Sequence, residues 1–230
     1  MKIRRTVGEV LWPSPAEFLA SLGGSRESAS VALLELVWKG YDLLLGDLAD
    51  IDFTRSFDDL ERELTQLLEK RIRRVMTGFE PFEIQHGPYE RETRRPAPAQ
   101  PPQYDLAFIL RANERVMWPL EAKVLPRALV QYVQDVQREY LTCRYGPFSR
   151  EGAMLGYVVA GNPEDHFSAV AAAMSGTLSG HPAFIDRPHR FSDHIRAVPA
   201  EKSYPSEFRI HHLLLVFTDP ITLADLAETG

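Results

Sequence analysis

The chain has 230 residues, of which 44% are hydrophobic and 25% are charged. These proportions are typical of a globular protein and argue against a disordered or membrane-embedded chain. The formal net charge of -6 excludes a protein that coats nucleic acid with an overall basic surface. Contact with nucleic acid therefore needs a local basic face. The length suits one domain with a full hydrophobic core.

Three features predict a cytoplasmic protein with no membrane partner. The longest apolar runs, residues 31–37 and 213–217, are far shorter than the roughly 20 residues of a membrane-spanning helix. Residues 1–9 are basic and polar and contain no apolar signal core. Cys143 is the only cysteine, so an internal disulfide is excluded and a reducing compartment is favoured.

The sequence predicts helices in the first third of the chain. Residues 15–22 form a short predicted helix before a pair of glycines, and apolar residues at helical spacing predict a longer helix over 28–45 that Gly46 ends. The clearest helix is residues 57–76, because Ser56 is a suitable N-cap, acidic residues follow it and basic residues occupy the last turn.

Strands follow these helices. Residues 79–86 predict a first strand, and residues 87–103 predict a loop because they are rich in proline and arginine. Two apolar runs, residues 104–110 and 116–124, are separated by the polar residues 111–115, which is typical of a β-hairpin.

The remaining elements alternate. We expect a helix over 126–141, a central strand over 153–160 because the run is fully apolar, and a helix over 163–178. Residues 181–205 read as irregular, and residues 208–217 as a last strand. No internal repeat or linker divides this order of elements, which is that of an α/β protein.

The predicted hairpin carries charges in an unusual place. Asp105 opens a strand that is otherwise apolar, and Glu121 and Lys123 alternate with apolar residues, so both point to one face of the sheet. If the hairpin is symmetric about Asn113, Asp105 lies directly opposite Glu121. The two carboxylates then share a face.

Opposed carboxylates repel one another, so a cation is expected between them. Mg²⁺ prefers carboxylate oxygens and water, and Lys123 could orient an attacking water and offset charge on a phosphoryl group. This arrangement suits phosphodiester hydrolysis. The alternative is that Glu121 and Lys123 lie on a wet sheet face while Asp105 caps the turn before its strand.

At these residues the sequence resembles the PD-(D/E)xK, or restriction-endonuclease-like, nucleases. The matching segments are residues 103–108 and 119–124, and the order of elements over residues 57–160 is similar to the helix, three-stranded meander, helix and strand of that superfamily. Tyr104 stands where the name-giving proline would be. The segments 144–145 and 151–157 are also similar to uncharacterised bacterial nuclease-like proteins, some of them associated with defence against phage.

The resemblance implies roles for particular residues. Asp105 and Glu121 are expected to bind Mg²⁺ or Mn²⁺ together with the carbonyl of Ala122, and Lys123 is expected to be catalytic. A glutamate from the first core helix often joins such sites. Glu61 and Glu63 compete for that place, and Glu61 is preferred because it lies one turn before apolar residues of the packing stripe. From the polar side of the helix after the hairpin, which also holds Gln134, Asp135 and Arg138, we select Gln131.

Basic and histidine residues provide the expected contacts to nucleic acid. The loop arginines Arg91, Arg94 and Arg95, together with His194 and Arg196, are candidates to bind phosphate. A second basic group, Lys70, Arg71, Arg73 and Arg74, crowds the end of the predicted helix 57–76. Solvated surface is the alternative for both groups.

The sequence therefore predicts an α/β protein with a restriction-endonuclease-like core, an N-terminal helical extension over 1–55 and a nuclease-like domain over 56–230 that ends in an additional helix and strand. The expected activity is Mg²⁺-dependent cleavage of nucleic acid, DNA being favoured over RNA. The N-terminal helices are candidates for a homodimer contact or for docking a partner protein. A catalytically inactive module of the same fold, binding nucleic acid or a partner in a larger complex, is the alternative.

Overall fold

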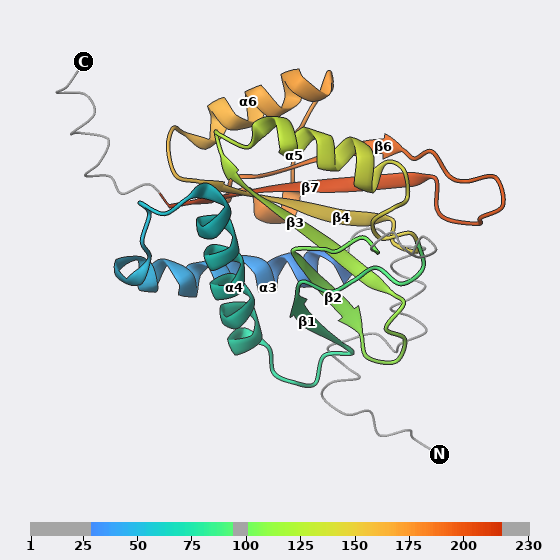
Figure 1. Ribbon diagram of the computed structural model, residues 1–230, viewed down its shortest axis with the longest axis horizontal. Coiled ribbons are helices and arrows are strands. Elements are labelled where there is room, and N and C mark those ends of the chain that lie inside the picture. The colour runs from blue at the N-terminus through green and yellow to red at the C-terminus, as the bar shows by residue number, and fades with distance from the viewer. Residues whose placement is uncertain (1–28, 94–100, 218–230) are drawn as a thin grey trace.

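The computed structural model describes residues 29–93 and 101–217, so the predicted helix over 15–22 lies outside the described residues. The described chain is an α/β protein built on a mixed, open seven-stranded sheet (Figure 1). The helices are α3 (Ala29–Leu44), the 3-10 helix η1 (Leu45–Asp50), α4 (Phe57–Val75), α5 (Leu129–Asp135), the π-helix η2 (Val136–Tyr140), α6 (Pro163–Met174) and the 3-10 helix η3 (Pro182–Phe184). The strands are β1 (Phe82–His86), β2 (Leu106–Leu110), β3 (Met117–Leu125), β4 (Glu151–Val158), β5 (Ser179–Gly180), β6 (His189–Ile195) and β7 (Glu207–Val216).

The strand order is β1-β2-β3-β4-β7-β6-β5. β1, β2 and β3 form an antiparallel meander, whereas β4 is parallel to both of its neighbours, β3 and β7. The prediction of a central strand is confirmed, because β4 is in the middle of the sheet and buried at every residue. Helices α3 and α4 pack on one face of the sheet, and α5 and α6 pack on the other (Figure 1).

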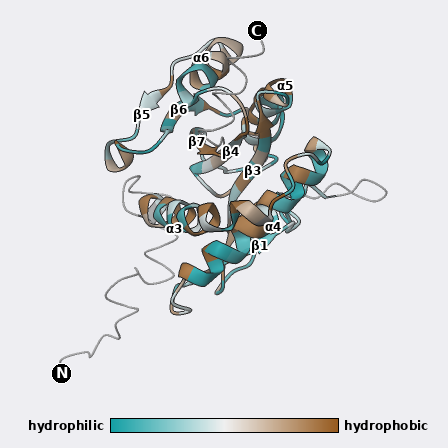
Figure 2. Cartoon of the chain, turned by 90° about the vertical axis from the view of Figure 1, so that its left-hand side faces the viewer, coloured by the Kyte–Doolittle hydropathy of each residue, from teal (hydrophilic) through white to brown (hydrophobic). Residues whose placement is uncertain are grey.

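Helix α4 confirms the prediction over residues 57–76 to within one residue. The Ser56 hydroxyl accepts a hydrogen bond from the backbone N–H of Asp59 at 3.3 Å, which caps the helix. Its apolar side meets the sheet and its polar side faces outward, so hydrophobic and hydrophilic residues alternate along it in Figure 2. The residues of α4 that are buried in the core are Leu60, Leu64, Leu68 and Ile72.

Helix α3 packs into the same hydrophobic core as α4 and the sheet, so the described N-terminal residues share one core with the strands. The helix predicted over residues 28–45 is confirmed to within one residue at each end, and the chain continues through Gly46 as the 3-10 helix η1. None of the helices in the described segments combines the length and the apolar character that crossing a bilayer requires.

The hairpin register is confirmed. Leu106 pairs with Leu120 and Ala107 with Pro119. The two residue numbers of each pair have the same sum, as a hairpin centred on Asn113 requires. The turn closes where Asn113 N–H donates to the Leu110 carbonyl at 3.0 Å. Extending the register by one residue beyond the last β2 pair brings Asp105 opposite Glu121.

One predicted segment is wrong and another begins at a different residue. Residues 181–205 are not irregular, because they contain β6 and η3. β6 has no apolar alternation: its buried residues are His189 and Ser192, and Ser192 is hydrogen-bonded to His212 of β7. The predicted helix over 126–141 begins three residues late, at Leu129, because residues 126–128 form a turn in which Ala128 N–H bonds back to the Val124 carbonyl.

Helices α3 and α4 cross at a glycine. A Cβ atom at Gly40 would lie 2.6 Å from Ile72 Cγ1 and 2.9 Å from the Ile72 backbone nitrogen. We expect Gly40→Ala to lower the free energy of unfolding by about 1–3 kcal/mol, measured by urea denaturation, because backbone cannot yield as a flexible side chain does. The matched control is Gly46→Ala, since nothing lies within 4 Å of a Cβ there. Equal stability of the two variants would contradict this account of the crossing.

Candidate active site

The ammonium group of Lys123 lies among acidic side chains from four segments of the chain. Its Nζ donates a hydrogen bond to the backbone carbonyl of Ala122 at 2.7 Å. The distances from Nζ to carboxylate oxygens are 2.9 Å for Glu121 of β3, 3.2 Å for Asp135 of α5, 3.7 Å for Asp105 before β2 and 3.8 Å for Glu61 of α4. These five side chains are called the Lys123 cluster below.

The cluster forms where β2 stops pairing with β3. Beyond Leu120 the edge of β3 that faces β2 pairs with no strand of the described segments. The Asp105 carboxylate accepts the Ala122 N–H at 2.8 Å, and the Glu61 carboxylate accepts the N–H of Val124. The two acids thus satisfy backbone donors that a strand would otherwise take.

Burial dominates the electrostatics of the cluster. It raises the pKa of Glu61 to about 7, an effect that Lys123 opposes and Asp105 reinforces. Burial followed by the charge of Asp105 raises the pKa of Glu121, and burial also raises the pKa of Asp135. For Lys123, burial alone would lower the pKa, but the surrounding carboxylates outweigh it and the pKa is raised.

The donor set of the cluster fits a hard divalent cation. One ammonium group faces four carboxylates, and Glu121 Oε2 is buried with no hydrogen-bond partner among residues 29–93 and 101–217. A buried carboxylate oxygen left without a partner is costly. Within the described residues no group of three or more His, Cys, Asp and Glu side chains is arranged to hold a metal ion. The candidate ligands in the Lys123 cluster form a smaller set, namely the carboxylates of Asp105 and Glu121 with the Ala122 carbonyl. Such a set is sufficient for Mg²⁺, which commonly binds one or two protein carboxylates and keeps water as its other ligands.

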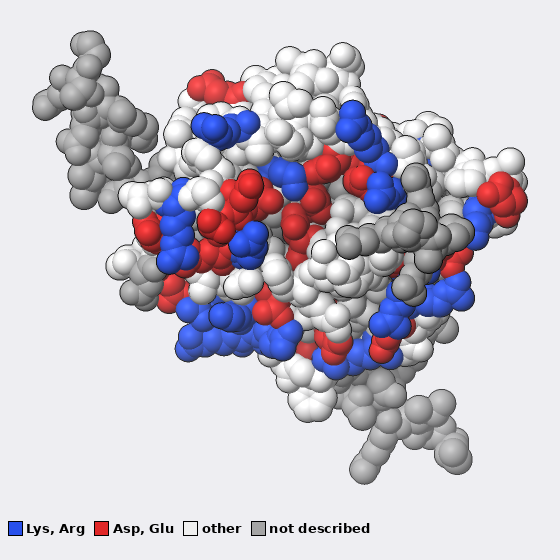
Figure 3. Space-filling model, in the orientation of Figure 1, with Lys and Arg blue, Asp and Glu red and all other residues white. Residues whose placement is uncertain are grey.

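The cluster opens to solvent through a pocket of about 410 Å³ between α4 and the ends of β1 and β2. Glu61, Asp105 and His86 line this pocket, with Arg62 and Thr65 on its α4 side. Figure 3 shows acidic side chains gathered in a hollow over β3, between α4 and α5.

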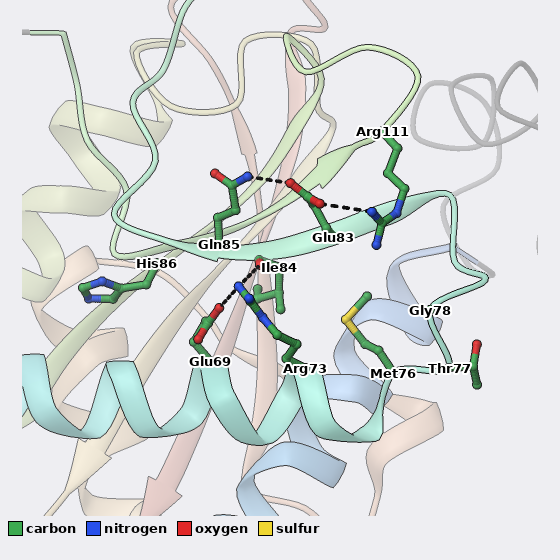
Figure 4. A pocket seen from close by; sticks show the side chains of 10 residues that line it. All are labelled: Glu69, Arg73, Met76, Thr77, Gly78, Glu83, Ile84, Gln85, His86 and Arg111. Carbon is green, nitrogen blue, oxygen red and sulfur yellow. Dashed lines mark hydrogen bonds and ion pairs between the residues drawn. The ribbon is translucent and has the colours of Figure 1, made fainter.

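A second pocket, about 660 Å³, continues on the other side of His86 between α4 and β1 (Figure 4). Its two arginines are occupied. Arg73 pairs with Glu69 and also donates to the Ile84 carbonyl, while Arg111 pairs with Glu83 at 3.1 Å. This pocket is therefore close to neutral, and it offers an anion no unpaired cation.

Three of the predicted catalytic residues, Asp105, Glu121 and Lys123, are brought together by the structure. Glu61 joins them, whereas Glu63 turns to Arg55 at 3.0 Å. Gln131 is exposed and makes none of the contacts of the cluster.

The residue that sequence reasoning missed on α5 is Asp135, four positions after Gln131. A signal for it was present. Asp135 is followed by the buried Val136 and preceded at helical spacing by the buried Tyr132, so it borders the side of the helix that meets the sheet.

The predicted nucleic-acid contacts are dispersed. Arg91 is exposed and paired with Glu114 at 2.6 Å, and Arg94 and Arg95 lie outside the described residues. His194 is partly buried on β6 and hydrogen-bonded to Ser192 at 2.7 Å.

Arg196 does not reach the surface as contact with phosphate requires. It is only 4% exposed, its guanidinium donates to the carbonyls of Tyr145, Gly146 and Ser149, and it stacks over Phe208. Arg196 therefore holds the loop between η2 and β4, and the expectation that it binds nucleic acid is corrected.

His211 and His212 point to opposite faces of the sheet, as the strand alternation predicts. His211 contacts His189 and Glu151 on the α3 side, at 3.2 Å and 3.3 Å. His212 contacts Tyr132 and Ser192 on the α5 side, at 2.9 Å each. Both histidines are buried core residues with hydrogen-bond partners, and neither forms one of the ion pairs of the Lys123 cluster.

Comparisons of the chain with protein-family models, with curated proteins and with solved structures found no match in any of the three.

Proposed function

We propose that the chain is a metal-dependent nuclease that hydrolyses phosphodiester bonds, with DNA favoured over RNA. The observation that carries the proposal is the convergence of four carboxylates and the Ala122 carbonyl on the ammonium of Lys123. The order of the elements around it, α4, the β1-β2-β3 meander, α5 and parallel β4, supports a restriction-endonuclease-like core. A role in defence against phage rests on the sequence resemblance alone and is proposed with it.

Asp105, Glu121 and the Ala122 carbonyl would hold Mg²⁺ or Mn²⁺. Such an ion supplies a Lewis acid for a phosphoryl oxygen and makes a bound water more acidic. Lys123 offsets the negative charge that develops on the phosphoryl group, which is the usual work of a positioned cation in phosphoryl transfer.

The two flanking acids position Lys123 and handle protons. Glu61 and Asp135 approach the ammonium from α4 and α5, so they fix it from both faces of the sheet. With a pKa of about 7, the carboxylate of Glu61 can take up a proton near neutral pH, as a general base for an attacking water must do.

A non-catalytic module of the same fold is the second candidate. The observation that favours it is that Lys123 already compensates part of the acidic charge, so the cluster could act as a buried ion network and nothing more. The two candidates differ in their response to a divalent ion, because an ion that binds only the folded state raises the unfolding temperature.

The test is cleavage of plasmid, linear duplex DNA, single-stranded DNA and RNA in Mg²⁺ or Mn²⁺, with EDTA as the metal-free control. We expect cleavage of at least one substrate and a metal-dependent rise in unfolding temperature. We expect Asp105→Asn to lose most of that rise. We also expect it to lower cleavage by about tenfold or more, because losing even an outer-shell partner of a metal ligand costs about tenfold. Asp193→Asn, at an exposed aspartate on β6, is the matched control. No cleavage and no thermal response in the unmodified protein would overturn the nuclease proposal and leave the module.

A further inference from the structure

An arginine and a phenylalanine form a stacked pair at the rim of the Lys123 cluster. The guanidinium carbon of Arg127 lies 5.0 Å from the ring centroid of Phe57, within the range of a cation–π contact. Phe57 is 39% exposed and Arg127 is exposed, so the pair faces solvent and is not part of the core.

The pair is tied to the cluster through the backbone. Phe57 is four residues before Glu61 on α4, so the two residues lie on the same side of the helix, about 6 Å apart along its axis. Arg127 is in the turn after β3, whose Ala128 N–H bonds to the Val124 carbonyl at 3.0 Å. The N–H of Val124 in turn bonds to Glu61, so one residue of β3 links both sides.

The guanidinium of Arg127 forms no ion pair within the described residues, so it can bind an anionic ligand. Among the described residues no carboxylate lies within the 4.0 Å of an ion pair from its guanidinium, whereas Arg62 on the same side is paired with Asp59 at 3.0 Å. The guanidinium lies over the Phe57 ring, and Arg127 is exposed to solvent. A base can stack on an arginine plane while the N–H groups bond to its phosphate.

We infer that Phe57 and Arg127 form a stacking platform for an unpaired base next to the cleaved phosphate, so that the substrate is a single-stranded segment of nucleic acid. This inference rests on the proposed function, since the cluster defines where the phosphate lies. A base in a duplex is already stacked on both faces, so only an unpaired strand can use the platform. The negative charge of the cluster makes a cation at its rim necessary to hold a phosphate strand.

The test is binding in EDTA, where cleavage does not interfere. Fluorescence anisotropy is measured with labelled single-stranded DNA, the same sequence as RNA and the DNA duplex, each at several salt concentrations. We expect Arg127→Gln to weaken single-strand binding about tenfold and to reduce the salt slope by about 0.7, the value for one phosphate contact to a single strand. We expect Phe57→Leu to weaken binding severalfold with an unchanged salt slope, because it removes the stacking ring and no charge.

Arg190→Gln is the matched control, because Arg190 also stacks on an aromatic ring, that of Phe167, but is paired with Glu164 and lies on the other face of the sheet. We expect no change for it. Wild-type affinity and salt slope in Arg127→Gln would overturn the platform, and so would an equal loss for the duplex. If the unmodified protein cleaves while Arg127→Gln binds normally, only the platform fails. If it binds single strands through Arg127 but cleaves nothing in Mg²⁺ or Mn²⁺, the nuclease proposal fails and the platform stands.

Discussion

Replacing Lys123 with methionine is expected to destabilise the metal-free protein and to lower cleavage by about 10²–10³-fold. The side chain of Lys123 is 13% exposed and is the shared cation of four carboxylates. Its removal leaves those acids to repel one another in a largely buried site. Loss of one partner of a buried ion pair costs about 3–5 kcal/mol, and some of that cost is relieved when a carboxylate takes up a proton.

The informative measurement is the unfolding temperature of Lys123→Met in EDTA and again in Mg²⁺ or Mn²⁺. A divalent ion replaces part of the missing positive charge, so the variant is expected to gain more from metal than the unmodified protein does. Lys39→Met is the control, because Lys39 forms an exposed pair with Glu35 on α3. If Lys123→Met is as stable as the unmodified protein in EDTA and gains nothing extra from metal, Lys123 is not the counter-ion of the cluster.

The central part of this site could be predicted because strand geometry is local. Side chains alternate along a strand, and a symmetric hairpin fixes which residues face each other. Those two facts bring Asp105 opposite Glu121 with Lys123 on the same face, and the observed register agrees. Glu61 was also accessible to sequence reasoning, since helical spacing placed it beside the packing stripe of α4.

The contribution of α5 could not be predicted in the same way. Which polar residue of a helix faces a site depends on where the helix begins and how it is rotated. The turn after β3 delays the start of α5 to Leu129, and the chain changes to π-helix at Val136. The acid that reaches Lys123 is then Asp135, while Gln131 faces solvent.

Strand β6 was missed for a different reason. Strands are recognised in sequence by apolar alternation, but β6 has polar residues on both sides. Its buried positions are satisfied by side chains of β7 instead: Ser192 by His212, and His189 by His211. Pairing between polar residues distant in sequence leaves no periodic signal in either segment alone.

The pH dependence of stability gives a separate test of the cluster, through Glu61. Its pKa is about 7 in the folded protein against 4.5 for an ordinary glutamate, so the folded state holds the proton more tightly. The associated stabilisation is complete below about pH 4.5 and is lost as pH rises through about 7. We expect this contribution of Glu61 to the free energy of unfolding in EDTA to fall by about 2–3 kcal/mol between pH 5 and pH 8, because one pKa unit corresponds to about 1.4 kcal/mol. Burial lowers the pKa of His181, His189 and His212, which makes total stability rise with pH below about 6.5, so the contribution of Glu61 is measured as a difference between two proteins.

Glu61→Gln lacks this contribution, so we expect its stability relative to the unmodified protein, measured by urea denaturation, to increase between pH 5 and pH 8 and to be the higher of the two at pH 8. The amide keeps an oxygen for the Val124 N–H but carries no charge, so it imitates the protonated acid. Glu35→Gln, on the exposed side of α3, is the control and should leave the slope unchanged. The raised pKa values of Glu121 and Asp135 act in the same direction as that of Glu61 and are present in both proteins. A stability difference between the two proteins that does not change from pH 5 to pH 8 in EDTA would mean that Glu61 is not forced against the other acids, and a cation would have no excess charge there to bind.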